Sequence, residues 1–176
     1  MTSAAHVDTI PDDLAARLHR LESLQFARNT LARYMALCDQ PCAEHGFPQL
    51  PDLFTEDALW EGLGERYAAT FGRRRGRAAI VAFLNGYLAP SPHFKRNLHF
   101  LTSESVTLAA DQTYVTGQWV MLQISTYAEG NSEAISARLE VEFRAAADGR
   151  WLISRFGTQR LDCVPWNAAE SHGVVA

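Results

Sequence analysis

The sequence lacks the features that mark several large classes of protein. Only three of its 176 residues are cysteine, an odd number without a disulfide framework, so we expect reduced thiols in a cytoplasmic protein. No apolar run approaches the roughly 18 residues that a membrane span needs, so we expect no membrane partner. The first residues show no basic stretch followed by an apolar one, and we therefore expect no signal peptide.

Motifs for nucleotides, metals and nucleic acids are missing as well. The chain has no P-loop and no Gly-x-Gly-x-x-Gly segment, and Cys38 and Cys42 lack the spacing of a zinc knuckle. The net charge of −4 disfavours a dedicated nucleic-acid binder, and the basic run at residues 72–77 is more typical of a solvated turn or a subunit contact. We therefore expect no cofactor, no metal and no nucleic-acid partner.

The sequence does contain a clear succession of helical and strand patterns. Apolar residues at helical spacing predict a first helix from about Leu14 to Cys38. Residues 50–62 predict a helical turn followed by a strand, residues 64–72 alternate like the second strand of a hairpin, and residues 78–88 predict another helix. The last third of the chain holds four long β-branched and aromatic runs separated by turn residues, which predict an antiparallel meander.

This order of elements predicts an α+β fold. We expect a strongly curved antiparallel sheet that forms a cone, with helices packed on its concave side and a pocket inside. A single domain should cover residues 12–162, with a flexible N-terminus at residues 1–11 and a C-terminal tail at residues 163–176.

One carboxylate conflicts with its predicted local structure. Asp39 falls at the end of the first helix, because Gln40 precedes Pro41 and is pushed away from helical angles. A negative charge there faces the negative end of the helix dipole, at a cost of a few tenths to about 1 kcal/mol. A functional role would explain this placement, and so would a hydrogen bond to the backbone or an ion pair with Arg33 or Arg96.

Five segments spread over residues 14–161 follow one another in a recognisable order. They are YMALCDQ, LPDLFTEDALWEG, GRAAIVAFL, HFLTSESVTLAADQTYVTGQW and DGRWLISRF. Together they resemble the NTF2-like superfamily, which has a cystatin-like fold, and in particular its SnoaL-like branch. That branch includes polyketide cyclases and relatives of scytalone dehydratase and bile acid 7α-dehydratase. The superfamily also holds binding modules and assembly subunits, so the resemblance indicates the fold more firmly than the reaction.

The resemblance implies three catalytic residues. Asp39 and His99 match an acid and a histidine that work as a pair in dehydratase-like members, and Tyr34 matches a tyrosine that polarises or orients the substrate. The chemistry suits these side chains, because an imidazole can take or give a proton near neutral pH and a carboxylate can fix its tautomer. A phenol can donate a hydrogen bond to a carbonyl or leaving oxygen.

Alternatives for the histidine stay open at this point. Strand alternation places His99 with Leu101 and Ser103, but both faces of this strand are largely apolar, so His99 could instead be a core or interface histidine. His93, in the loop before the strand, is a rival that could reach over the mouth of the pocket.

Further residues are candidates for binding the substrate. Trp119, Met121 and Gln123 share one face of a long predicted strand, and Trp60 and Phe54 lie in or near the first hairpin. Aromatic residues at such positions are more often core than ligand contacts, yet their abundance predicts an apolar pocket for a ring-containing substrate. The run GQWVMLQIST carries neither the additional acid nor the second histidine that some relatives have on the central strands, which departs from the full dehydratase pattern.

The sequence supports three hypotheses for the function. The leading one is a cofactor-independent lyase, isomerase or cyclase that acts on a small hydrophobic substrate. The second is a non-catalytic subunit, because the chain also resembles the small subunits of ring-hydroxylating dioxygenases, and the third is a small-molecule carrier. Because sheets of this fold commonly pair face to face, we expect a homodimer or a higher homo-oligomer.

Overall fold

The computed structural model describes residues 12–39, 49–87 and 92–166. The proposed flexible N-terminus at residues 1–11 and most of the proposed C-terminal tail lie outside these ranges. None of the helices that the model describes combines the length and the apolar character that a membrane crossing requires.

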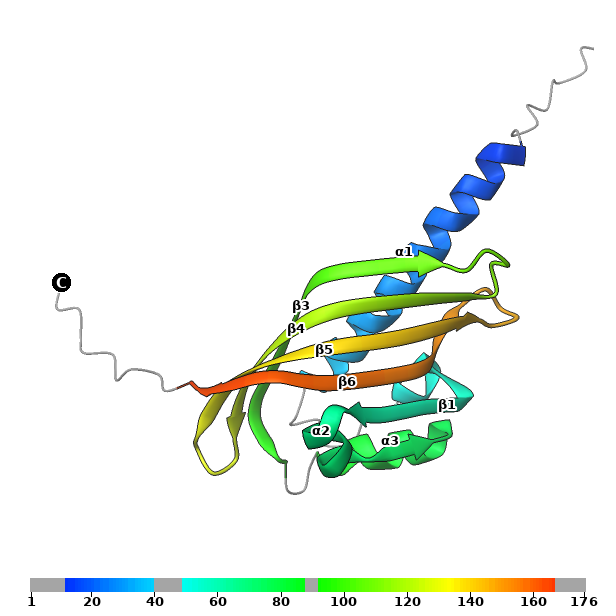
Figure 1. The fold of residues 1–176 in the computed structure, drawn as a ribbon. Coiled ribbons are helices and arrows are strands. Elements are labelled where there is room, and N and C mark those ends of the chain that lie inside the picture. Colours follow the sequence, from blue (N-terminus) through cyan, green and yellow to red (C-terminus); the bar gives the residue numbers. More distant parts are fainter. Residues whose placement is uncertain (1–11, 40–48, 88–91, 167–176) are drawn as a thin grey trace, which may run out of the picture.

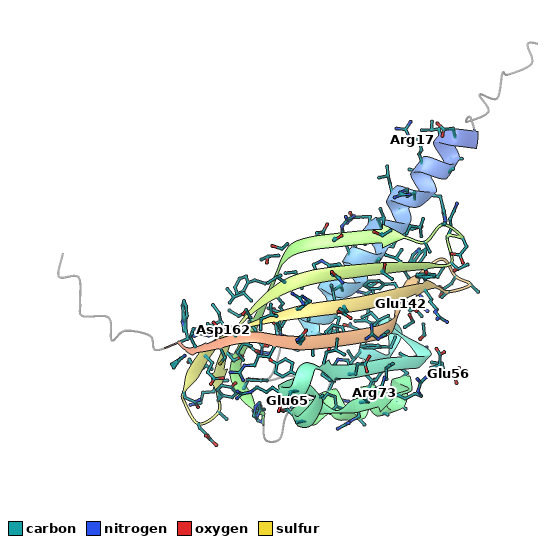
Figure 2. The ribbon with its side chains drawn as sticks, viewed as in Figure 1. Arg17, Glu56, Glu65, Arg73, Glu142 and Asp162 are labelled. Atoms are coloured by element: carbon teal, nitrogen blue, oxygen red, sulfur yellow. The ribbon has the colours of Figure 1, made fainter. Side chains whose placement is uncertain are left out.

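The first helix forms where the apolar spacing predicted it. Helix α1 (Asp12–Cys38) packs its second half against the concave face of the sheet, where Ala27, Leu31 and Tyr34 are buried. Its first half projects beyond the sheet (Figure 1), and Arg17 marks this end in Figure 2. The buried half brings the end of the helix, and with it Asp39, into the interior of the molecule.

Three of the next elements lie close to the predicted positions. They are the 3₁₀ turn η1 (Leu50–Leu53), strand β1 (Phe54–Leu63) and helix α3 (Arg77–Asn85). Strand β2 (Arg73–Arg75) was not predicted. The basic run that we expected to be a turn therefore contains a strand, since β2 pairs with β1 in antiparallel register.

The prediction of a strand at residues 64–72 is wrong, because Gly64–Phe71 forms helix α2. Tyr67 and Phe71 stand four residues apart, so a helix places both rings on one face, where their centroids lie 4.7 Å apart. Gly62 allows the helix to fold back onto β1, because a Cβ there would lie 2.0 Å from the carbonyl oxygen of Tyr67.

The predicted meander of four long strands is confirmed. It consists of β3 (Phe94–Leu108), β4 (Tyr114–Tyr127), β5 (Ser132–Ala145) and β6 (Trp151–Pro165). The sheet has the order β2-β1-β6-β5-β4-β3. It is mixed rather than wholly antiparallel, because β1 runs parallel to β6. Strand β6 ends at Pro165, so its last three residues, Cys163 to Pro165, lie in the segment predicted as a tail.

The elements form the predicted α+β architecture. The long strands bend together, α1 crosses one face of them, and α2 and α3 lie beside β1 (Figure 1). The largest side chains without solvent exposure come from α1, η1, β1 and the inner faces of β5 and β6, and include Leu31, Leu53, Phe54, Phe143 and Ile153. The helices thus cover the concave face of the sheet and leave space between the two layers.

Candidate active site

A cavity of about 140 Å³ lies between the concave face of the sheet and the helices. Two groups of side chains border it. We call Trp60, Phe71, Phe83, Tyr87 and Phe156 the aromatic wall, and Asn97, His99 and Gln123 the polar wall. An engineered apolar cavity of about 150 Å³ binds benzene, so a space of this size suits a single ring.

Asp39 and His99, 60 residues apart in the chain, meet beside this cavity. The Nδ1 atom of His99 lies 2.6 Å from Oδ1 of Asp39, and the backbone N–H of His99 donates to the same oxygen at 3.0 Å. The side chain of His99 is 9% exposed and that of Asp39 25%. His99 lines the cavity. The predicted contact between these two side chains is therefore present.

The geometry explains how a carboxylate is accommodated at the end of α1. Asp39 follows the last helical residue and its backbone N–H still donates to the carbonyl of Met35 at 2.9 Å. Two N–H groups of His99 then converge on Asp39 Oδ1, and hydrogen bonds to a charged acceptor are stronger than neutral ones. These bonds offset the unfavourable helix dipole.

The contact also determines which histidine nitrogen is available. A carboxylate can only accept, so Nδ1 of His99 carries the hydrogen that Asp39 binds. In the neutral imidazole, Nε2 is then the acceptor. No described residue forms a hydrogen bond with Nε2, which leaves a basic nitrogen on a side chain that lines the cavity.

Tyr34 lines the same cavity with its hydroxyl group in a defined role. The indole Nε1 of Trp60 lies 3.0 Å from the Tyr34 oxygen and can only donate, so that oxygen accepts. The phenol keeps its own hydrogen, which faces the neighbouring Cys38 sulfur and is the hydrogen it could give to a ligand. Burial raises the pKa of Tyr34 well above its usual value, which keeps the phenol protonated. Burial likewise raises the pKa of the neighbouring Cys38 thiol to about 12, so Cys38 is not a thiolate nucleophile.

A polar network that the sequence did not reveal continues the polar wall. Asn97 Oδ1 accepts from Gln123 Nε2 and from Ser125 Oγ, each at 2.8 Å, and Gln123 Nε2 also donates to Ser125 Oγ at 2.9 Å. Asn97 Nδ2 donates to the carbonyl of Cys38 at 3.4 Å. Strand alternation could have indicated Asn97 and Ser125, because each lies two residues from a predicted site residue, His99 and Gln123 respectively.

The predicted substrate contacts divide into two groups. Trp60, Met121 and Gln123 border the cavity, whereas Phe54, Trp119 and His93 do not. A ligand contact of these last three therefore stays a prediction, which the cavity lining does not support.

Packing explains why these three side chains lie outside the cavity lining. Phe54 is fully buried and supports Tyr34 from behind, with ring centroids 5.6 Å apart. Trp119 folds back along β4 over Gly117, where a Cβ would lie 2.1 Å from its ring, and donates to Glu104 at 3.2 Å. His93 is exposed and packs its ring against other aromatic side chains, including Tyr127 at 5.3 Å.

No cluster of three or more histidine, cysteine or acidic side chains that could hold a metal ion occurs among residues 12–39, 49–87 and 92–166. The polar groups around the cavity include an imidazole, the phenols of Tyr34, Tyr67 and Tyr87, the hydroxyl of Thr158 and two amides. The arrangement provides a base, hydroxyl donors and an oriented amide, which is a set for moving protons.

The model of the SnoaL-like domain matches residues 19–157, which is most of the chain. The chain belongs to the SnoaL-like domain family. No curated protein matches this SnoaL-like chain. The resemblance that the five sequence segments indicated is therefore confirmed at the level of the family.

Solved structures agree with this assignment. An NTF2-like protein with a cystatin-like fold from Novosphingobium aromaticivorans is 26% identical, with a TM-score of 0.65 over 89% of this chain and 93% of that chain. The hexachlorocyclohexane dehydrochlorinase LinA-type3 from Novosphingobium barchaimii LL02 is 18% identical, with a TM-score of 0.70 over 86% and 95%. A candidate scytalone dehydratase from Novosphingobium aromaticivorans DSM 12444 is 19% identical, with a TM-score of 0.67 over 84% and 89%. At these identities the last two likenesses show that the SnoaL-like chain shares their fold.

Proposed function

We propose that this SnoaL-like protein is a cofactor-independent lyase, isomerase or cyclase that removes a proton next to a carbonyl group of a small cyclic substrate. The observation that carries the proposal is the 2.6 Å contact between His99 Nδ1 and Asp39 Oδ1, on a ring that lines the cavity and whose Nε2 forms no hydrogen bond with any described residue. A dehydrochlorinase and a candidate dehydratase with the same fold support this class of reaction.

The base in this reaction is Nε2 of His99. It takes the proton from the carbon next to the carbonyl, and the electron pair of the broken C–H bond moves toward the carbonyl oxygen as an enolate. Asp39 stabilises the imidazolium that forms, because it already accepts the hydrogen on Nδ1. A well-placed acid–base group contributes about 10²–10⁴-fold in rate.

Tyr34 serves as the donor to the enolate oxygen. Its hydroxyl accepts from Trp60 and retains its own hydrogen, and its raised pKa keeps that hydrogen in place. In an elimination, the enolate electrons re-form the carbonyl, the C=C bond forms, and the leaving hydroxyl departs as water with the proton returned by His99. In an isomerisation the proton returns to a different carbon, and in a cyclisation the carbanion attacks a carbonyl of the same substrate.

The cavity also helps to distinguish the enzyme from the assembly subunit and the carrier. A space of about 140 Å³ bordered by rings is the size of a monocyclic ligand. A subunit that only serves assembly has no need of such a space, so the cavity disfavours the resemblance to dioxygenase small subunits. A carrier would bind the same ligand without converting it, and turnover decides between these two functions.

A minimal substrate tests the proposal directly. We would use 3-hydroxycyclohexanone, which has one ring, a carbonyl and a hydroxyl on the β carbon, and follow its conversion to 2-cyclohexenone and water by absorbance. Exchange of its ring hydrogens in D₂O, followed by NMR, reports proton removal even without elimination. His99→Ala and Asp39→Asn should each lower both rates at least about a hundredfold while the proteins stay folded.

His93→Ala is the matched control, because this histidine lies six residues earlier and outside the cavity wall, and it should leave both rates unchanged. Near-normal rates in both the His99 and the Asp39 variants would refute the assignment of the base. Binding of the ketone without exchange or elimination would identify a carrier instead.

We propose in addition that the protein forms a homo-oligomer through the outer face of β3 and β4. Leu98, Phe100 and Leu122 are between 37% and 47% exposed there, and Phe100 and Leu122 are direct cross-strand neighbours. A contiguous apolar patch of this kind is rare on a monomer. Light scattering after size exclusion should show a dimer or larger species, and Phe100→Ser with Leu122→Ser should shift it to the monomer. A wild-type monomer at micromolar concentration would contradict this.

A cytoplasmic location is a further proposal, based on cysteine use. Cys38 and Cys163 are free thiols in the structure, as expected for a protein that works in a reducing compartment. Fractionation of the cells that produce the protein checks this location, and recovery from the secreted fraction would contradict it.

A further inference from the structure

The network of Asn97, Gln123 and Ser125 has a direction that starts at the backbone of α1. The carbonyl oxygen of Cys38 can only accept, so the Asn97 atom that faces it at 3.4 Å is the amide nitrogen. The other amide atom, Oδ1, therefore faces Gln123 and Ser125 and accepts from both. The orientation of a helix end thus determines how the Asn97 amide is placed.

The same logic fixes Gln123. Because Asn97 presents an acceptor, Gln123 must present its amide nitrogen, and its two N–H groups go to Asn97 Oδ1 and to Ser125 Oγ. Asn97 is 4% exposed and Ser125 is fully buried, so water does not compete for these bonds. Reversing the Gln123 amide would place two acceptors against each other in the interior, which is unfavourable because neither oxygen would have a donor.

One polar atom of the network is left for a ligand. Gln123 lines the cavity, no described residue donates to its Oε1, and this atom is not among the buried unpaired atoms of the described chain. It is an acceptor only. Gln123 and His99 are direct partners across β3 and β4, so this oxygen and the imidazole border the same part of the cavity.

We infer that Gln123 Oε1 is a specificity site for a hydroxyl group on the substrate, and that Asn97 and Ser125 are positioning residues that hold it in the accepting orientation. The inference rests on the proposed function in one respect, which is that the cavity is the substrate site. The substrate class is a monocyclic compound with a carbonyl group and a hydroxyl on the β carbon. The substrate hydroxyl donates a hydrogen bond to Gln123. This bond turns the lone pairs of the hydroxyl oxygen toward His99, which returns the proton when water leaves.

Binding of two small probes without turnover tests this inference. Phenol and fluorobenzene have nearly the same shape, but only phenol can donate a hydrogen bond. The measured quantity is the ratio of the Kd of fluorobenzene to that of phenol, obtained by NMR titration of the purified protein. In Gln123→Met, which keeps the length of the side chain, we expect this ratio to fall about three- to tenfold, as expected for the loss of one net hydrogen bond.

Two further variants sharpen the test. Gln118→Met changes the same residue type on the same strand, but Gln118 is exposed and lies outside the cavity wall, so the ratio should stay at the wild-type value. Ser125→Ala removes a partner of both amides without touching the cavity and should lower the ratio part of the way. This variant keeps the inference testable if Gln123→Met does not fold, and thermal melting of each protein shows which variants are folded.

Several outcomes would overturn the inference. A ratio that is unchanged in both Gln123→Met and Ser125→Ala would show that the Gln123 amide does not accept a hydrogen bond from the ligand hydroxyl. A ratio that falls in His99→Ala, and not in Gln123→Met, would assign the hydroxyl to the imidazole. The proposed reaction fails separately, if His99→Ala retains turnover, because probe binding does not require proton transfer.

Discussion

The two walls of the cavity are held in place by different forces. The aromatic wall is a stack of rings: Phe156 lies nearly parallel to Trp60 at 5.6 Å and edge-on to Tyr34 at 5.0 Å. Such contacts depend on buried area and tolerate small shifts. The polar wall is fixed by hydrogen bonds, which specify not only where a side chain lies but also which of its atoms faces the ligand.

This difference predicts that substitutions in the two walls have different effects. Substitutions in the aromatic wall should change stability and the fit of the ligand, because they remove packed surface. Substitutions in the polar wall should change chemistry and specificity, because they remove or reorient a base or an acceptor. Substitutions in and beside the two walls should separate these effects.

The aromatic wall should dominate stability. Phe156→Ala removes a ring that contacts both Trp60 and Tyr34 and should lower the free energy of unfolding by about 3–5 kcal/mol in urea titrations. Tyr114→Ala, on an exposed ring of β4, is the control and should change it by less than about 1 kcal/mol. Equal losses in the two variants would show that the wall is not a packed unit.

The protonation of Cys38 should make stability depend on alkaline pH. Because burial raises the pKa of Cys38 from 9.0 to about 12, the folded protein keeps a proton that the unfolded chain has lost. Stability is therefore complete below pH 9 and falls as the pH rises from 9 toward 12, by about 1.4 kcal/mol per pH unit for this one proton.

Urea titrations at several pH values measure this slope. Cys38→Ala should unfold with a slope that is smaller by about one proton over the same pH range. If the variant and the wild type lose stability in parallel above pH 9, the thiol is not the group responsible.

The hydrogen bond between Trp60 and Tyr34 should have an intermediate effect on stability. Tyr34→Phe leaves the buried Nε1–H of Trp60 without its acceptor, which should lower the free energy of unfolding by about 1–3 kcal/mol. Tyr87→Phe removes a hydroxyl from the same cavity, where no described residue binds it, and should have a smaller effect. Thermal melting measures both, and a reversed order would contradict the proposed bond.

The smallest effect on ligand binding is expected for Trp119. Trp119→Phe loses one hydrogen bond to Glu104 and part of a buried ring, so stability should fall by about 1–3 kcal/mol. Its affinity for phenol should equal that of the wild type, because this ring does not border the cavity. Trp60→Phe, in the aromatic wall, should change the affinity. A change of phenol affinity in Trp119→Phe would restore this residue to the site.

The sequence predicted the elements with strong periodic signals. The long apolar stripe gave α1 and placed Asp39 at its end, and the β-branched runs gave the four-strand meander. The prediction from the sequence was wrong at Gly64–Phe71, because a run this short fits both a strand and a helix. The helix is favoured by the contact between the rings of Tyr67 and Phe71, and the sequence does not display this packing.

Part of the site was predictable for the same reason. Alternation put Gln123 on a face with Met121, and both border the cavity, but it put Trp119 there as well. The indole turns away because Gly117, on the same face, leaves room for it along the strand. Alternation assigns a face to a side chain but does not say in which direction the side chain extends across that face.

The sequence by itself determined much of the local structure: a helix that ends at an acid, strands whose alternate residues share a face, and the residue types of a proton-transfer site. Only the tertiary structure decided that Asp39 touches His99, and that the Cys38 carbonyl orients Gln123 through Asn97. The physical reason is that periodicity acts between near neighbours in the chain, whereas these hydrogen bonds join groups that only packing brings within 3.5 Å.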